Sequence, residues 1–116
     1  MPATVHVGLA VTSHLPHLIA FAMMNAISGQ PMGRDFLSLA GPGFRDFTRI
    51  AASEPAMWRD IMMSNREELL AQSRIFQRNL QALELMIANG NDEALLEQIE
   101  SASAVRANWS MAKQHK

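Results

Sequence analysis

Residues 13–24 read SHLPHLIAFAMM, a short polar pentad followed directly by an apolar run. If this segment is helical, His14 and His17 lie three residues apart, so their side chains share one face. Pro16 lacks a backbone donor and clashes with the preceding turn. We therefore expect the helix either to kink here or to begin near residue 15, with Ser13 as its N-cap. A kink would free a backbone carbonyl where the two imidazoles gather.

The composition favours a single helical domain. The chain has 116 residues and nearly half of them are apolar, whereas tyrosine is absent and β-branched residues are sparse after residue 12. We therefore expect an all-α fold of five to six helices. A formal charge of -1 provides no basic surface for nucleic acid. The absence of cysteine excludes disulfides and thiolate metal sites and fits a reducing compartment, so we expect a cytoplasmic protein.

The N-terminal third has no charged residue before Arg34. Polar residues interrupt its apolar run, and no basic residue precedes it, so we expect neither a membrane span nor a signal peptide. An uncharged helix of this kind is typical of one enclosed by protein on nearly all sides. In so small a domain, this indicates a second chain or domain that covers part of it.

Turn and capping signals divide the remaining chain. We expect residues 1–8 to be a leader of uncertain structure and residues 9–116 to form one helical domain. Helices are expected over 10–27, 33–40, 44–52 and 55–63, followed by a long helix that ends at Asn89-Gly90 and a last one capped by Asn91-Asp92. Ser53 is expected to cap the fourth helix, and Ser64 and Asn65 to begin capping boxes for the long one.

Apolar spacing predicts which helix faces are buried. The long helix has a heptad-like seam made of Leu69, Ser73, Phe76, Leu80, Leu83 and Ile87. Two further helices are expected to turn apolar residues inward: Phe36 and Leu39 in one, and Leu95, Ile99, Ala102 and Trp109 in the other.

Two groups of residues could carry chemistry. His14 and His17 could bind a metal or a substrate, or simply be satisfied by backbone and water. Metal is least favoured, because neither an HExxH motif nor a neighbouring carboxylate cluster supplies further ligands. Arg45 and Arg49 share a helical face after a glycine-rich turn, so they could bind an anion while Asp46 pairs with Arg49. The alternative is a solvated charged surface.

Three blocks of this sequence closely resemble one family. They are LAVTSHLPHL (residues 9–18), LAGPGFRDFTRIA (39–51) and MWRDI (57–61). Together they resemble the C-terminal helical domain of prephenate dehydrogenases, including the cyclohexadienyl and arogenate types, whose fold is that of 6-phosphogluconate-dehydrogenase-like enzymes. In that family a Rossmann domain binds NAD(P), and the helical domain forms the dimer and closes the prephenate site. The resemblance implies a homodimer acting on prephenate or arogenate in tyrosine biosynthesis.

The resemblance also implies roles for individual residues. His17 would line the substrate pocket, Arg49 would pair with a substrate carboxylate, Asp46 would position Arg49, and Trp58 would lie near that network. Ser13, His14 and Arg45 would contribute further contacts.

The sequence contains no GxGxxG fingerprint. We therefore expect this chain alone to be inactive, with no catalytic residue or metal of its own, and to need a nucleotide-binding domain in cis or in trans. The alternative is a stand-alone module that binds a ligand, regulates or dimerises without catalysis.

Overall fold

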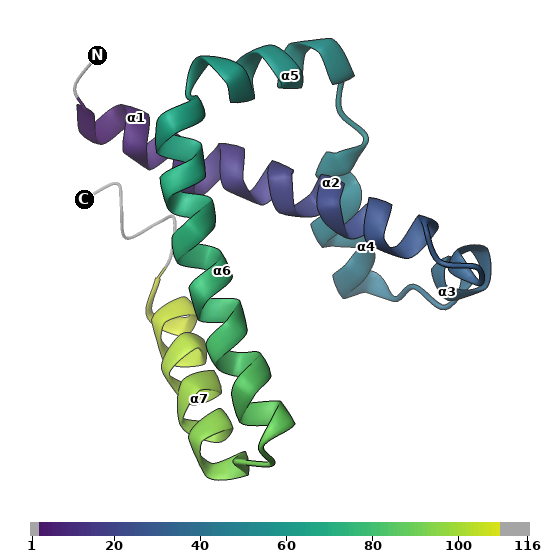
Figure 1. Cartoon of the computed structure of the whole chain (residues 1–116), viewed down its shortest axis with the longest axis vertical. Helices are drawn as coiled ribbons and strands as arrows, with labels where there is room; N and C mark the ends of the chain where they lie inside the picture. Colours follow the sequence, from purple (N-terminus) through teal and green to yellow (C-terminus); the bar gives the residue numbers. More distant parts are fainter. Residues whose placement is uncertain (1–2, 110–116) are drawn as a thin grey trace. The chain divides into compact units, whose positions relative to one another are not determined.

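The structure, a computed structural model, describes residues 3–109 as an all-helical chain (Figure 1), and no strand occurs in this range. The predicted all-α class is confirmed. Two compact units meet between Arg74 and Ile75, within the longest helix. The elements are α1 (Ala3–Leu9), a π-helical turn η1 (Ala10–His14), α2 (Leu15–Ser28), α3 (Gly33–Ser38), α4 (Pro42–Thr48), a 3-10 turn η2 (Arg49–Ala51), α5 (Pro55–Ser64), α6 (Arg66–Ala88) and α7 (Asp92–Asn108).

The first helical stretch begins earlier than its predicted start near Ala10. Helix α1 begins at Ala3 and continues through η1 into α2. The β-branched residues of this segment weigh only weakly against helix, and extending an existing helix avoids the cost of nucleating a new one. The Thr12 hydroxyl also donates to the Gly8 carbonyl at 2.7 Å, within the same stretch.

The backbone accommodates Pro16 by widening into the π-helical turn η1. The Leu15 N–H donates to the Ala10 carbonyl, five residues back, and Pro16 has no N–H with which to continue an α-helical ladder. The helix therefore does not begin at residue 15, and no side-chain cap is present there, so Ser13 is not an N-cap. Such single π-turns occur frequently at functional sites.

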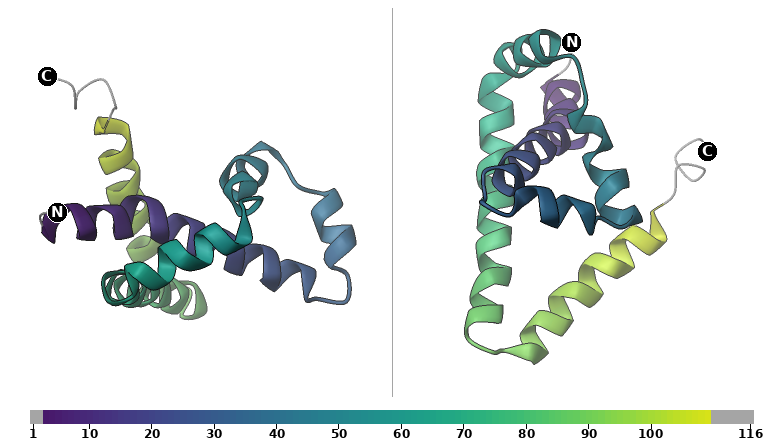
Figure 2. Two further views of the ribbon diagram at one scale, coloured as in Figure 1. Left: turned by 90° about the horizontal axis from the view of Figure 1, so that it is seen from above. Right: turned by 90° about the vertical axis from the view of Figure 1, so that its right-hand side faces the viewer.

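Helices α3 and α4 and the turn η2 all contact α2 (Figures 1 and 2). The start of α3 approaches the end of α2 closely at Gly33, which is buried. A side chain at this position would not fit, because its Cβ would collide with the Ile27 carbonyl. The prediction that Phe36 and Leu39 point inward is wrong, since these side chains are 43% and 82% exposed.

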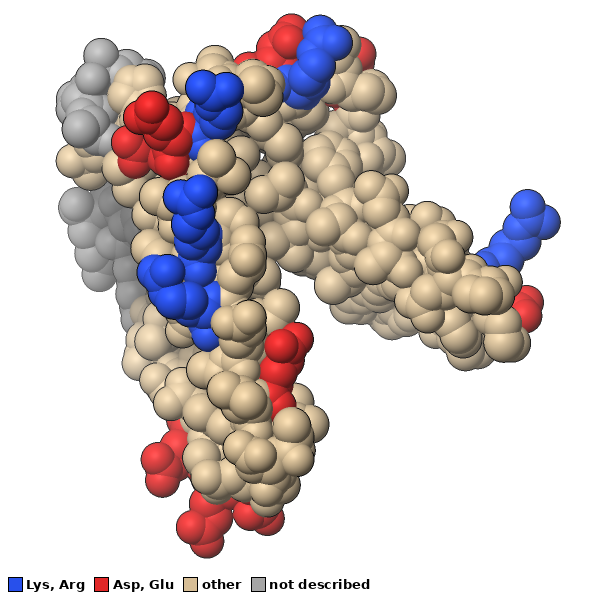
Figure 3. Space-filling model, in the orientation of Figure 1, with Lys and Arg blue, Asp and Glu red and all other residues tan. Residues whose placement is uncertain are grey.

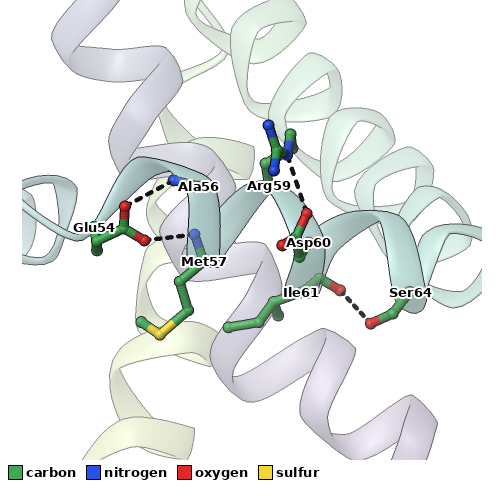
Figure 4. A network of polar contacts seen from close by, with 7 residues as sticks. All are labelled: Glu54, Ala56, Met57, Arg59, Asp60, Ile61 and Ser64. Atoms are coloured by element: carbon green, nitrogen blue, oxygen red, sulfur yellow. Dashed lines mark hydrogen bonds and ion pairs between the residues drawn. The ribbon is translucent and has the colours of Figure 1, made fainter.

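Helix α5 is capped by Glu54 and not by the predicted Ser53. The Glu54 carboxylate accepts from the backbone N–H groups of Ala56 and Met57 at 3.2 and 2.6 Å (Figure 4). The Ser53 hydroxyl instead bonds to the Ile50 carbonyl. A longer side chain can reach two free amides across the Pro55 turn.

The predicted capping boxes of α6 are also absent. The Ser64 hydroxyl donates back to the Ile61 carbonyl, and the Asn65 side chain lies against α1 and η1. The predicted cap of α7 is confirmed, because Asn91 Oδ1 accepts from the Ala94 N–H at 3.2 Å. Gly90 adopts the left-handed conformation, with φ of 65°, at the turn between α6 and α7.

The buried core of the described chain is small. Four hydrophobic residues are buried: Ala10, Leu15, Ala20 and Leu69. The described residues of this chain therefore do not enclose the first helical stretch. This agrees with the expectation that a second chain or domain covers part of it. The face in Figure 3 shows uncharged surface along α2. By length and composition alone, Thr4–Ser28 could cross a membrane, a test that the core helix of a soluble protein also passes.

The second unit leaves large apolar side chains in solvent. From the turn at Gly90, α6 and α7 diverge (Figure 2). Ile99, Ala102 and Trp109 are exposed rather than inward, and Leu95 is only half-buried. Along the predicted seam, Leu80 and Ile87 are 45% and 64% exposed, so no helix of the described chain covers them.

Candidate functional site

The centre of the candidate site is a contact between α2 and α5. The His17 ring stacks on Trp58 with ring centroids 3.6 Å apart and an interplanar angle of 15°. His14 meets the same indole edge-on, at 6.1 Å and 81°. The structure therefore brings together His14, His17 and Trp58, which lie in two separate motif blocks of the sequence.

Ser13 contributes its backbone to this group. The Ser13 carbonyl accepts a hydrogen bond from His17 Nδ1 at 2.8 Å. The sequence predicts a backbone carbonyl beside the two imidazoles, and the Ser13 carbonyl does lie against the His17 ring.

Asn65 joins the site from the start of α6, and it was missed as a site residue. Its Nδ2 lies 3.0 Å from the His6 carbonyl and 3.4 Å from His14 Nδ1. The sequence marked Asn65 only as a helix cap, and no local pattern points to a contact with residues so distant in the chain.

The surroundings of His14 favour the neutral form of its ring over the charged form. Partial burial lowers the pKa of His14 below its usual value because desolvation disfavours the charged form, and the nearby His17 lowers the pKa further. A neutral imidazole keeps one donor and one acceptor nitrogen.

The predicted arginine group is arranged differently. Arg45 Nε donates to the Ala40 carbonyl at 3.2 Å, so it braces the turn before α4. Asp46 and Arg49 are exposed, and they form no ion pair with each other. Within residues 3–109, the ion pair between side chains is Arg59 with Asp60, at 3.0 Å (Figure 4). Because both Asp46 and Arg49 are exposed to water, they would gain little by pairing with each other.

Two open hollows lie along α2 and share Phe21 and Asn25. One, of about 320 Å³, is lined by Phe21, Asn25, Pro55, Trp58, Arg59 and Met62. The other, of about 340 Å³, is lined by Phe21, Met24, Asn25, Thr48, Ala51 and Ala52. Trp58 therefore borders the first hollow. Thr48 and Ala51, which lie close to Arg49 in the sequence, border the second.

Phe21 and Arg59 were not singled out from the sequence. Phe21 lies four residues after His17, so helical spacing could have placed it on the same face; their rings are 6.3 Å apart.

Within the described part of the chain, no three His, Cys, Asp or Glu side chains gather closely enough to hold a metal ion.

Comparison with known proteins identifies a family that this chain matches. The family model of the prephenate dehydrogenase dimerization domain matches residues 2–101. The chain belongs to this family. The resemblance seen in the three sequence blocks is thereby confirmed.

Relatives in this family are longer than the chain. A cyclohexadienyl dehydrogenase of Zymomonas mobilis is 38% identical over 100 residues, which cover 84% of this chain and 34% of that protein. A prephenate dehydrogenase of Bacillus subtilis is 32% identical over 84% of this chain and 26% of its own length. The chain thus spans about a third or less of these two relatives.

Solved structures share the fold. Prephenate dehydrogenase from A. aeolicus, in complex with hydroxyphenyl propionate and NAD+, superposes with a TM-score of 0.80 at 36% identity, covering 88% of this chain and 36% of that one. Synechocystis arogenate dehydrogenase gives a TM-score of 0.87 at 24% identity, over 95% of this chain and 41% of that one, and supports the fold alone.

Proposed function

We propose that this chain is the substrate-binding and dimerisation domain of a cytoplasmic, NAD(P)-dependent prephenate or cyclohexadienyl dehydrogenase in tyrosine biosynthesis. The observation that carries the proposal is the stack of His17 on Trp58, formed by two family-like sequence blocks beside an open hollow. The 36% identity to a prephenate dehydrogenase crystallised with hydroxyphenyl propionate and NAD+ supports it.

Prephenate carries two carboxylates, a hydroxyl and an apolar ring. His17 and Trp58 would form one wall of its pocket, with Ser13 and His14 beside them. Arg49 has no side-chain ion pair in the described chain, so its planar guanidinium is available to a substrate carboxylate. Asp46 would help to orient Arg49, and Arg45 would hold the preceding turn in place.

A nucleotide-binding domain, in cis or in trans, would complete the enzyme. Bound NAD(P) would supply a hydride acceptor for the ring carbon that bears the hydroxyl, while the ring loses a carboxylate as CO2. The residues of this chain would bind and orient the dianion and shield it from water.

The decisive experiment supplies the missing part. The chain would be joined, or mixed, with the nucleotide-binding domain of a relative, and prephenate-dependent reduction of NAD+ and NADP+ would be recorded. Activity only when both parts are present supports the proposal. A folded combination that binds NAD(P) but never responds to prephenate or arogenate would overturn it. Saturable binding of tyrosine to the chain alone, measured by calorimetry, would instead favour a regulatory module.

The proposed dimer rests on the exposed apolar surface. In the second unit, Leu85 and Ile87 are 62% and 64% exposed, and Leu96 and Val105 are 56% and 69% exposed. So many exposed large apolar side chains in one unit favour an interface, and a second copy would cover them. The family is itself named for dimerisation.

Light scattering tests the dimer directly. The chain should scatter as a dimer at micromolar concentration, and Leu85→Glu should shift it toward monomer by burying an unpaired charge. Gln98→Glu adds the same charge at a polar position of α7 and should leave the dimer intact. A monomeric parent chain would contradict this part of the proposal.

A further inference from the structure

We propose that Asn65 is a positioning residue, which holds His14 in the tautomer protonated at Nε2 while the Ser13 carbonyl holds His17 in the opposite tautomer. The inference about the tautomers rests on hydrogen-bond geometry alone. Its consequence for ligand binding rests on the proposed function.

The first step fixes the orientation of the Asn65 amide. The two ends of an amide side chain look alike in shape, so their placement follows from their partners. The partner at 3.0 Å is the backbone carbonyl of His6, which can only accept a hydrogen bond. Asn65 must therefore turn Nδ2, its donor end, toward His6.

The second step fixes the tautomer of His14. The same Nδ2 atom lies 3.4 Å from His14 Nδ1 and has a second hydrogen to donate. A donor facing Nδ1 requires a lone pair there, so the ring proton of neutral His14 sits on Nε2. Protonated His14 would lose this bond, which agrees with the lowered pKa of His14.

The third step treats His17 in the same way. His17 Nδ1 lies 2.8 Å from the Ser13 carbonyl, so Nδ1 must carry a proton and donate. In the neutral ring, Nε2 then has a lone pair. A backbone carbonyl thus sets each tautomer: directly for His17, and through the Asn65 amide for His14.

The two rings therefore present unlike Nε2 atoms. His14 offers an N–H donor and His17 a lone-pair acceptor, and within residues 3–109 neither Nε2 has a hydrogen-bond partner. Both rings also contact Trp58, which limits their rotation. A pair of this kind suits a ligand group that both donates and accepts, such as a hydroxyl, better than a pair of bare carboxylate oxygens.

Nitrogen-15 NMR of the full chain labelled at histidine reads the tautomers directly, near neutral pH and without any ligand. The four histidines would be assigned from His6→Gln, His14→Gln and His115→Gln. We expect the His14 proton on Nε2 and the His17 proton on Nδ1. A His14 ring with its proton on Nδ1 would overturn the proposal.

Two variants test the role of Asn65. Asn65→Ala should release His14 into a mixture of tautomers while His17 stays unchanged, and the His17 signal also reports that the fold is intact. Asn65→Asp replaces the donor with a carboxylate, so it should move the His14 proton to Nδ1 and raise the His14 titration midpoint by about one pH unit. An unchanged His14 tautomer in the Asp variant would overturn the role of Asn65, even if the Ala variant failed to fold.

These outcomes separate the two proposals. The tautomers are measured without substrate or nucleotide, so they can be as assigned in a chain that supports no dehydrogenase activity. Conversely, activity with a mixed His14 tautomer would leave the proposed function standing and remove only the role of Asn65.

Discussion

The histidine face, made of His14 and His17, and the arginine segment, residues 45–49, belong to the same unit but are held in different ways. His14, His17 and Trp58 contact one another, and backbone carbonyls fix the ring positions. Asp46 and Arg49 are exposed and make no such contact. This chain alone therefore forms the aromatic wall of the proposed pocket, whereas Arg49, the proposed anion-binding residue, has no ion pair within residues 3–109.

The difference follows from the interactions available to each group. Stacked rings exclude water from apolar surface, and this stabilises them without a ligand. Exposed charges lose little by staying hydrated and gain little by pairing. Substitutions in the two regions should consequently separate effects on stability from effects on substrate binding.

The largest expected effect is that of Arg49→Ala on substrate binding. In the enzyme completed with a nucleotide-binding domain, the KM for prephenate should rise about a hundredfold, because one charge-assisted bidentate contact is lost. Stability should hardly change, since Arg49 is exposed. Steady-state kinetics would measure the KM, and urea unfolding the stability.

Arg45→Ala is the matched control, because it removes the same charge from the same segment. It should lower stability modestly through loss of the bond to the Ala40 carbonyl. Equal increases in KM for both variants would show that a general positive field, rather than Arg49, attracts the substrate.

Trp58→Ala should have the second largest effect, this time on stability. The substitution removes the platform for both imidazoles, so the free energy of unfolding should fall by about 2 kcal/mol. Urea unfolding at a fixed protomer concentration would measure it.

Trp109→Ala provides a comparison within the same chain. Trp109 is 45% exposed and has Arg106 over its ring at 4.8 Å, so its loss should cost only about 0.5 kcal/mol. Similar losses for the two tryptophans would contradict a special role for the contact between α2 and α5.

The sequence predicted interactions between residues that are close together in the chain better than interactions between residues on separate helices. Local signals worked well: helical class, the Gly90 turn and the Asn91 cap all follow from neighbouring residues. The family resemblance placed Trp58 near Asp46 and Arg49. No spacing rule could predict its stack on His17, since that contact joins separate helices.

Predictions failed where local choices competed or where a second chain is expected. Glu54 displaced Ser53 as a cap because its longer side chain reaches two amides. Asn65 bonds to distant residues instead of capping α6. Leu39 and Ile99 were placed inward from periodicity, which identifies an apolar face but not the molecule that covers it.

Asp46→Asn should change substrate binding much less than Arg49→Ala does. Because Asp46 and Arg49 are exposed and unpaired with each other in the described chain, their attraction is worth only about 0.5 kcal/mol, or roughly a twofold change in the KM for prephenate. A tenfold or larger increase would show that substrate binding draws the two side chains into a buried pair, so the arginine segment would then resemble the histidine face.

The smallest effect should be a dependence of stability on pH that arises at His14. Its pKa is lowered in the folded chain by burial first and by His17 second, whereas the unfolded chain titrates near the usual value of about 6.5. As the pH falls through that value, the unfolded state binds its proton first, so the free energy of unfolding decreases; the loss is complete once the pH is below the folded pKa.

Urea unfolding between about pH 7.5 and about pH 5 should show this slope in the parent chain and a shallower one in His14→Gln. His6→Gln, which alters a histidine without a ring contact in the described structure, should retain the parent slope. If His14→Gln also retained it, the pH dependence would arise outside the histidine face.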